Sequence, residues 1–223
     1  MRNDKYELTN ESIMVGETKL YRIKALKDIG SKYGYKVKAG ELGGYVESWR
    51  NLSRYGESWI ANNACVYGNA FVTDNATVYG NAKVYGDAII ADDASVYENA
   101  KVYGDAYVYG DAYVYGDACV YGKSSVCGSA KVHGKSEVYG IVRVESNMTI
   151  CDGNIDSNDK IVYLEIDGTP KTFHVSRDNT IVVSYKEINY FRKSVRWLYD
   201  EPTAKAYLMM CDIAELKLSD KLK

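Results

Sequence analysis

Five tyrosines recur at intervals of eighteen residues along the middle of the chain. They are Tyr67, Tyr85, Tyr103, Tyr121 and Tyr139, and Lys83 and Lys101 each precede one of them by two residues. If eighteen residues form one structural repeat, these side chains lie in one column. Aromatic rings can bind a base or a sugar through their faces, and lysines can bind phosphate.

We therefore predict a ligand-binding set made of Tyr85, Tyr103, Tyr121, Lys83 and Lys101, with a nucleotide-like small molecule as the ligand. Two alternatives stay open. Tyrosines can stack along a sheet column and only stabilise it, through cross-strand contacts of roughly 0.2–1 kcal/mol each. Tyrosine is also enriched where subunits meet, which would make the column a contact surface.

Catalytic groups are scarce, because the chain has only two histidines, His133 and His174. A general base needs a neutral imidazole within reach of the acceptor group. His133 occupies an ordinary outward position of the repeat, and His174 lies outside it, so neither is predicted as a base. Two histidines cannot supply a three-histidine zinc site, and P-loop, G-x-S-x-G and Rossmann motifs do not occur. We predict no catalytic residue, no cofactor and no metal site.

Five cysteines occur, an odd number, and no two of them have the C-x-x-C spacing. Zinc ribbons and disulfide frameworks are therefore not expected. We predict reduced thiols that act as small space-filling residues.

A period of six residues runs from Ser58 to Gly140 and must position the tyrosines. The fourteen residues at every sixth position from Ile60 to Val138 are Val or Ile, and the residue two before each is Ala or Ser. Residues two apart point to the same side of a strand, so each hexad places one small and one β-branched side chain inside. Glycine, followed by Asn or Asp, often fills the next positions, where a corner needs positive φ. Three hexads make one triangular coil, so fourteen hexads predict nearly five coils.

The pattern small-x-aliphatic-x-Gly-Asn/Asp resembles the hexapeptide repeat of left-handed parallel β-helices. The left hand is what the resemblance implies, since parallel crossovers are normally right-handed. The best-known enzymes of that fold are acyltransferases, which use a histidine base, typically beside a loop inserted between coils. No residue is inserted between Ile60 and Val138, so a divergent acyltransferase is the weaker alternative.

The segment before the repeats carries a second resemblance. LYRIKALKDI, followed by VKAGELGGYVES and NLS, is similar to phage and prophage proteins often labelled polymer-forming cytoskeletal. That group brings no established activity, and it makes a structural polymer a further alternative.

Charge and composition restrict the partners and the cellular location that we expect. The net charge is −2, so general nucleic-acid binding is not expected. The N-terminus lacks the apolar run of a signal peptide, and no apolar stretch is long enough to span a bilayer. We predict a cytoplasmic protein without membrane contact, located in the host cytoplasm if it is phage-encoded.

Both ends differ from the repeats and are predicted as caps. We predict a small β cap over 1–53, the repeat region over 54–147 and an α+β cap over 148–223. In the last, Ile161–Ile166, Thr172–Val175 and Thr180–Val183 are candidate strands. Two helices are expected, over 186–198 and 203–217, with Tyr207, Met210, Ile213 and Leu216 on the apolar stripe of the second.

The sequence also predicts which surface the subunits use to assemble. Caps over both ends leave the sides for subunit contacts, and the column of Phe71, Ile89 and Tyr107, with Tyr109 beside it, is the least polar side. We expect a closed homo-oligomer, with a trimer favoured by analogy with the fold. The predicted function is non-catalytic binding and assembly of phage or prophage type, which sequesters a nucleotide-like signal or a host protein.

Overall fold

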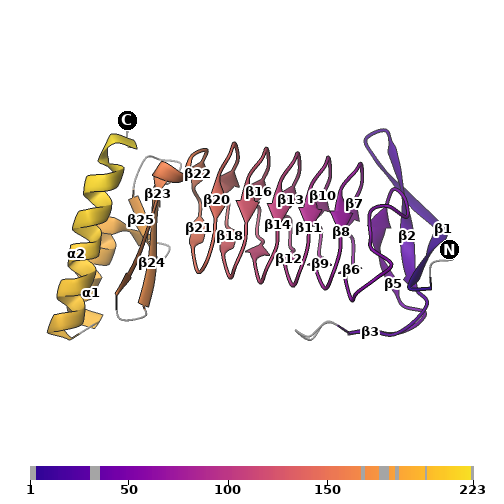
Figure 1. Cartoon of the computed structure of the whole chain (residues 1–223), viewed down its shortest axis with the longest axis horizontal. Coiled ribbons are helices and arrows are strands. Elements are labelled where there is room, and N and C mark those ends of the chain that lie inside the picture. Colours follow the sequence, from indigo (N-terminus) through magenta and orange to yellow (C-terminus); the bar gives the residue numbers. More distant parts are fainter. Residues whose placement is uncertain are drawn as a thin grey trace.

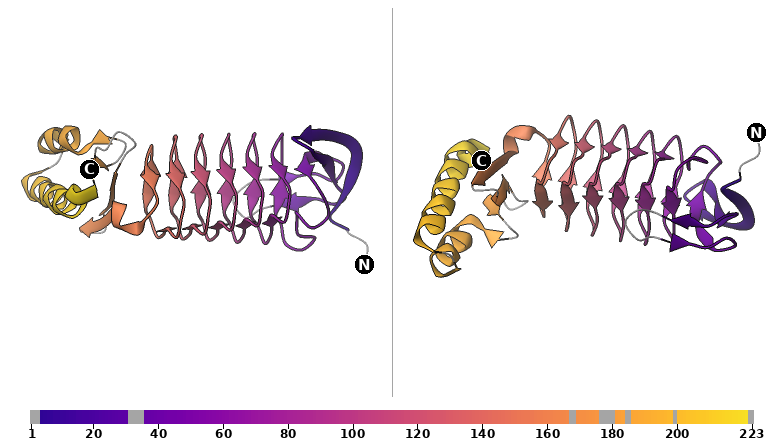
Figure 2. Two further views of the ribbon diagram at one scale, coloured as in Figure 1. Left: turned by 90° about the horizontal axis from the view of Figure 1, so that it is seen from above. Right: turned by 60° about the horizontal axis from the view of Figure 1, so that its bottom comes forward.

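The computed structural model describes residues 4–30, 36–166, 169–175, 181–183, 186–198 and 200–221. A stack of triangular coils occupies the middle of the molecule, with an N-terminal hairpin at one end and an α+β layer at the other (Figure 1). The fold is mainly β, as predicted, and its centre is a parallel β-solenoid of about 6 turns. Views from two further directions show the same unbroken stack (Figure 2).

Three parallel sheets form the sides of the coils. The first face contains β5 (Leu42–Val46), β7 (Cys65–Val66), β10 (Lys83–Val84), β13 (Lys101–Val102), β16 (Cys119–Val120), β19 (Glu137–Val138) and β22 (Asn154–Ile155). The second face contains β8 (Phe71–Val72), β11 (Ile89–Ile90), β14 (Tyr107–Val108), β17 (Ser125–Val126) and β20 (Arg143–Val144). The third face contains β6 (Trp59–Ile60), β9 (Thr77–Val78), β12 (Ser95–Val96), β15 (Tyr113–Val114), β18 (Lys131–His133) and β21 (Thr149–Cys151).

The interior of the coils confirms the predicted alternation of inward and outward residues. Every aliphatic residue of the series from Ile60 to Val138 is buried, and so is the Ala or Ser two positions before it. The hexad strands from β6 to β18 each pair in register with the strand eighteen residues later, as Val84 does with Val102. Burying one such aliphatic side chain stabilises the fold by about 1.5–3 kcal/mol, so the stack holds itself together without a separate core.

The corners have the backbone conformation that glycine favours. Gly86 has φ 72°, and a Cβ built on it would lie 2.9 Å from the amide nitrogen of Gly104 in the next coil. Within the hexads from Ser58 to Gly140, four corners carry a side chain instead, at Asn62, Asp74, Asp92 and Glu98, with φ of 55–58°. Each of these side chains accepts a hydrogen bond from the corner amide of the next coil. This bond offsets the strain of a positive φ at a residue with a Cβ.

The stack extends beyond the hexads on both sides. Tyr45 and Val46 pair with β7, the first hexad strand on the first face, and Leu52 forms a parallel bridge with Val72. Val144, Ile150 and Ile155 continue the aliphatic columns and are buried. These rungs explain why about 6 turns form where the hexads alone predict nearly five.

Irregular spacing hides the outer rungs from a search for period six. Leu52 lies eight residues before Ile60, and Ile155 follows Ile150 by five. The break at Arg54 is therefore a longer corner within the stack.

At the N-terminal end, β1 (Tyr6–Val15) and β2 (Thr18–Ala25) form an antiparallel hairpin that extends the first face beside β5. The pairing is irregular between Leu8 and Ser12, around the polar Asn10–Glu11 pair. The short strands β3 (Ile29–Gly30) and β4 (Lys36–Val37) pair separately.

At the C-terminal end, β23 (Ile161–Ile166), β24 (Thr169–Val175), β25 (Ile181–Val183) and β26 (Lys186–Glu187) form an antiparallel sheet. The helices α1 (Ile188–Leu198) and α2 (Glu201–Leu218) cover its outer side, as Figure 1 shows, with short 3₁₀ turns at Asn158–Lys160 and Ser219–Lys221. Thr172 and His174 join this sheet to the last coil: the Thr172 hydroxyl accepts a hydrogen bond from the Thr149 amide, and His174 Nε2 lies 2.7 Å from the Cys151 carbonyl oxygen. The predicted strands and helices are confirmed; Thr180 lies outside the described residues.

One predicted stripe is partly wrong. Tyr207 and Met210 are buried on α2, but Ile213 and Leu216 are exposed. A step of three residues falls about 60° short of a full helical turn, so a stripe built only from such steps leaves the buried face. The buried face of α2 follows alternating steps of three and four residues through Ala204, Tyr207, Cys211, Ala214 and Leu218, with Met210 buried beside Cys211.

Candidate functional site

The predicted tyrosine column is a continuous stack of rings on the first face. Successive centroids from Tyr67 to Tyr139 lie 4.7–5.1 Å apart, with ring planes within 8° of parallel. Parallel strands that pair in register place each ring above the ring of the previous coil. The distance between the rings is therefore close to the spacing of neighbouring strands. The structure thus brings Tyr85, Tyr103 and Tyr121 together and sets Lys83 beside Lys101 in the neighbouring column.

Stacking restricts what these tyrosines can contact. The ring faces of Tyr85, Tyr103 and Tyr121 are covered by the neighbouring tyrosines, so a base cannot enter between them without separating two coils. Ring edges, hydroxyl groups and the two lysines are what remain for a ligand. Burial raises the pKa of Tyr103 to about 12, so its hydroxyl is neutral at physiological pH and can donate a hydrogen bond.

A second stack on the third face contains Tyr79, Tyr97, Tyr115 and His133, with centroids 4.7–4.9 Å apart. His133 continues this column, but its side chain is buried rather than solvent-facing. Desolvation by burial lowers the pKa of His133. The ring therefore packs as a neutral aromatic group at the end of the stack.

The second face carries the predicted contact column. Phe71, Ile89 and Tyr107 pair along it in register, and the ring of Tyr109 lies 4.3 Å from that of Tyr107. Ile89 and Tyr107 are among the exposed large apolar residues. The column continues through Ser125 to Arg143, so its apolar part is confined to the N-terminal half of the solenoid.

A pocket of about 610 Å³ opens where the hairpin meets the first coil. Its lining comes from β1, from the residue after β2, from the corner between Val46 and Ile60 and from β8, and consists of Tyr6, Glu7, Leu26, Trp49, Arg50, Leu52, Ser53, Arg54, Tyr55 and Phe71. Four of these side chains are aromatic. Trp49 and Tyr55 are 48% and 67% exposed, so both rings are accessible to a ligand.

The charge of this pocket is positive. Arg54 lies over the ring of Tyr55, with its guanidinium carbon 4.8 Å from the ring centroid. In the part of the chain that the structure describes, neither Arg50 nor Arg54 forms an ion pair, whereas the carboxylate of Glu7 lies 3.2 Å from the ammonium of Lys24. Two guanidinium groups beside aromatic rings can hold an anionic group and a planar ring together.

Tyr6 fixes the floor of the pocket. Its hydroxyl donates hydrogen bonds to the carbonyl oxygens of Leu52 at 2.9 Å and Trp49 at 3.2 Å. These bonds hold the corner that carries Trp49 and Arg50 against the first strand of the chain. The pocket shape therefore depends on docking of the hairpin.

Lys5 holds Ser53, a residue of the lining, although Lys5 itself does not line the pocket. Its buried ammonium donates to the carbonyl oxygen of Ser53 at 3.0 Å and to the Ser58 hydroxyl at 3.1 Å. Burial lowers the pKa of Lys5 to about 8, although the charge of Glu57 acts in the opposite direction. A lysine whose pKa lies near physiological pH therefore fixes the position of Ser53.

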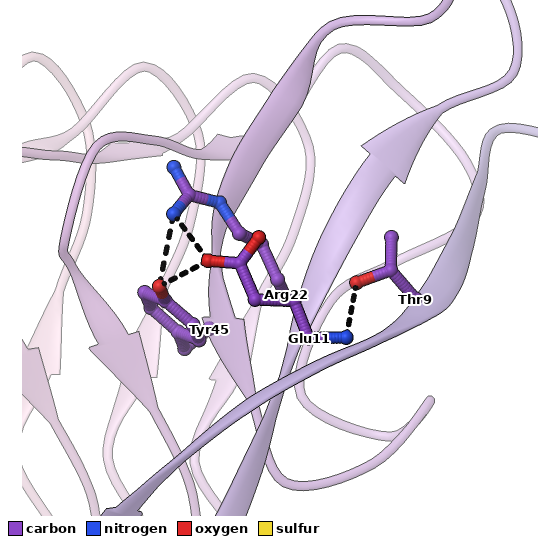
Figure 3. Close-up of polar contacts among 4 residues, drawn as sticks. All are labelled: Thr9, Glu11, Arg22 and Tyr45. Carbon is purple, nitrogen blue, oxygen red and sulfur yellow. Dashed lines mark hydrogen bonds and ion pairs between the residues drawn. The ribbon is translucent and has the colours of Figure 1, made fainter.

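A second polar cluster fastens the hairpin to the first face of the solenoid (Figure 3). One carboxylate oxygen of Glu11 accepts hydrogen bonds from Arg22 and from the Tyr45 hydroxyl, each at 2.9 Å. Arg22 also donates to the Tyr45 oxygen at 2.9 Å. The hydrogen bond from Arg22 is the main cause of the lowered pKa of Glu11, which keeps this group ionised. Because Tyr45 belongs to β5, the cluster joins both hairpin strands to the first coil.

Sulfur and imidazole groups gather where the last coil meets the C-terminal sheet, around Cys151 and His174. Burial, together with the charge of Asp152, raises the pKa of Cys151 to about 12, so its thiol stays protonated. Across the described ranges, no group of three His, Cys, Asp or Glu side chains is arranged to hold a metal ion.

Sequence reasoning missed the pocket residues Trp49, Arg50, Arg54 and Tyr55. The available signal was an aromatic residue next to an arginine, present twice within seven residues. The predicted boundary at residue 53 divides these residues, with Trp49 and Arg50 in the cap and Arg54 and Tyr55 in the repeat region.

None of the described helices has the length and hydropathy that crossing a membrane would require.

Neither the protein-family models nor the curated proteins include a match to this chain.

Proposed function

We propose that this chain is a non-catalytic binding protein that sequesters a small nucleotide-like ligand in the N-terminal pocket. The observation that carries the proposal is the combination of accessible aromatic rings with Arg50 and Arg54 in one pocket of about 610 Å³. Pockets for small ligands measure roughly 300–1,000 Å³, so a nucleotide fits this volume. A base would stack on Trp49 or Tyr55, and a phosphate would meet the guanidinium groups.

The stacked coils support sequestration rather than turnover. A rigid wall lowers the entropy that is lost when a ligand binds. The first coil supplies such a wall through Leu52 and Phe71. The burial of His133 keeps its ring from contact with a substrate, which favours a structural role over that of a general base. In this proposal the chain is a left-handed, hexapeptide-repeat protein of phage or prophage type that acts in the host cytoplasm.

Native mass spectrometry of the protein purified from cells tests the proposal directly. We expect the chain to carry a retained small molecule, or to bind one from a panel of nucleotides, with quenching of Trp49 fluorescence. Absence of any nucleotide binding at millimolar concentration would contradict the proposal. Turnover of an acyl-CoA would support the acyltransferase alternative instead.

A second candidate function is assembly through the second face. It is favoured by the exposure of Ile89 and Tyr107 beside Tyr109, since exposed apolar columns commonly mark a partner surface. In this candidate Phe71, Ile89, Tyr107 and Tyr109 contact further copies in a closed homo-oligomer, with a trimer favoured. A host protein is the alternative occupant of the same face. The native mass spectrum reports the oligomer and any retained molecule together.

A further inference from the structure

Helix α2 exposes an apolar stripe that the fold itself does not use. Met209, Ile213 and Leu216 are 60%, 37% and 79% exposed. Spacings of four and three residues place them on one face of the helix, opposite the face that packs on the C-terminal sheet. Figures 1 and 2 show α2 beside α1 in the outer layer at this end of the molecule, and the exposed stripe is open to another protein.

The residues around the stripe are complementary in size to the same residues of a second, antiparallel copy of α2. In an antiparallel pair of α2 helices centred on Met209, a residue three, four or seven positions before Met209 faces a residue at about the same distance after it in the other copy. This places the small Ala206 opposite the large Ile213, and Pro202 opposite Leu216. Small residues that face large ones allow two helices to approach and interdigitate.

The charges on the flank of the stripe follow the same symmetry. Lys205 and Asp212 are seven residues apart and therefore lie on the same side of the helix. A two-fold axis at right angles to both helices brings Lys205 of each copy beside Asp212 of the other. The Lys205 and Asp212 side chains are 73% and 69% exposed, although Lys205 also pairs with Glu201 and Asp212 with Arg192 within the chain.

We infer that α2 pairs with α2 of a second copy of this chain, antiparallel and around a two-fold axis at Met209. The contact uses the same surface on both copies, so it closes at two chains and cannot continue into a fibre. It joins two solenoids at their C-terminal ends and leaves the N-terminal pockets at the far ends of the dimer. Stable interfaces bury roughly 1,200–2,000 Å², which one helix pair does not reach alone, so the dimer forms in the micromolar range or above.

Sedimentation equilibrium across a concentration series tests this pairing with the full chain. The wild type should move from the chain mass of 25.0 kDa toward twice that value as concentration rises. Leu216→Lys should raise the dissociation constant by about tenfold or more, because it places a charge within the apolar contact. Ile141→Lys is the matched control, since Ile141 is 81% exposed but lies on the coils, and it should dimerise as the wild type does.

A cross-link identifies the partner and its orientation. Met209→Cys lies at the two-fold axis, so mild oxidation should yield a covalent dimer through this position, whereas Tyr190→Cys on α1 should yield much less. A wild type that stays monomeric at hundreds of micromolar overturns the inference. So does an oligomer that Leu216→Lys leaves unchanged, which would point to the second face. Loss of association in Leu216→Lys without a cross-link at Met209→Cys also overturns it, because α2 would then meet a different surface.

Discussion

The ring of Tyr6 lies against the indole of Trp49, with the two centroids 5.1 Å apart and the planes tilted by 34°. Tyr6 begins the first strand of the chain, and Trp49 belongs to the corner that leads into the coils. Their contact therefore connects docking of the hairpin with the shape of the pocket. The contact with Tyr6 already fixes the indole of Trp49 before a ligand stacks on it. This lowers the conformational entropy that is lost on binding.

Trp49→Ala should weaken nucleotide binding by about tenfold or more, because stacking of a base on an aromatic ring contributes about 1–3 kcal/mol. Arg54→Gln should weaken binding of phosphorylated ligands more than that of the nucleoside. Isothermal titration calorimetry measures both effects. Tyr190→Ala, which removes an exposed aromatic ring at the other end of the molecule, is the control. If Lys101→Ala abolishes binding and Trp49→Ala does not, the ligand binds on the tyrosine column instead.

Stability should rise with pH above about 8 because of Lys5. In the folded chain the pKa of this lysine is about 8, whereas the ordinary pKa of a lysine side chain in water is 10.5. Between these values the unfolded chain binds more protons, so raising the pH favours the folded state, by up to about 3 kcal/mol over the whole window. Thermal melting at pH 8 and pH 9.5 measures the slope. Lys5→Met should flatten it, Lys19→Met should not, and an equal slope in all three proteins would contradict the assignment.

Val102→Asp should prevent the solenoid from folding or destabilise it by at least about 3 kcal/mol, because an unpaired carboxylate would replace a buried valine. The control is Lys101→Asp on the same strand, whose side chain points to solvent and which should melt close to the wild type. Circular dichroism during thermal unfolding measures both. Near-normal stability of Val102→Asp would mean that the inward residues are assigned wrongly.

Substitutions at the corner glycine Gly86 should differ by side-chain type. Asn can accept a hydrogen bond from the Gly104 amide, as Asp92 does from Gly110 at 3.0 Å, so Gly86→Asn should lose little stability. Gly86→Val should lose more, by about 1–3 kcal/mol, because a β-branched residue is strained at positive φ and has no acceptor to offer. Urea unfolding of the two variants gives the comparison. Equal losses would show that steric contact with the next coil, and not φ, decides the cost.

Ile89→Lys combined with Tyr107→Lys should reduce the mass of any side-by-side oligomer toward 25.0 kDa without unfolding the chain. Both side chains are exposed, so the coils lose no core contact. Light scattering reports the mass, and Ile141→Lys serves as the control. A wild type that does not associate through its sides, or an oligomer that survives the double substitution, contradicts this interface.

The period of six was enough to determine the body of the fold. Ala100 and Val102 share the inward face because residues two apart point to the same side of a strand. Glycine marks most corners because a corner needs positive φ, which glycine adopts without steric strain. The same period put Tyr85 above Tyr67, and the structure adds only that the rings stack. These features depend on residues close in the sequence or one coil apart, which is why the pattern alone specifies them.

Only the tertiary structure decided where the coils end and what lies at the ends. Leu52 and Ile155 join the stack after steps of eight and five residues, and their fit depends on how each corner packs on its neighbour. The pocket brings Tyr6 beside Phe71, sixty-five residues away, through docking of the hairpin onto the first coil. On α2, the sheet below selects which side of the helix is buried, and it leaves Ile213 and Leu216 in solvent. Each of these features depends on contacts between segments that have no common period, so the sequence pattern could not supply them.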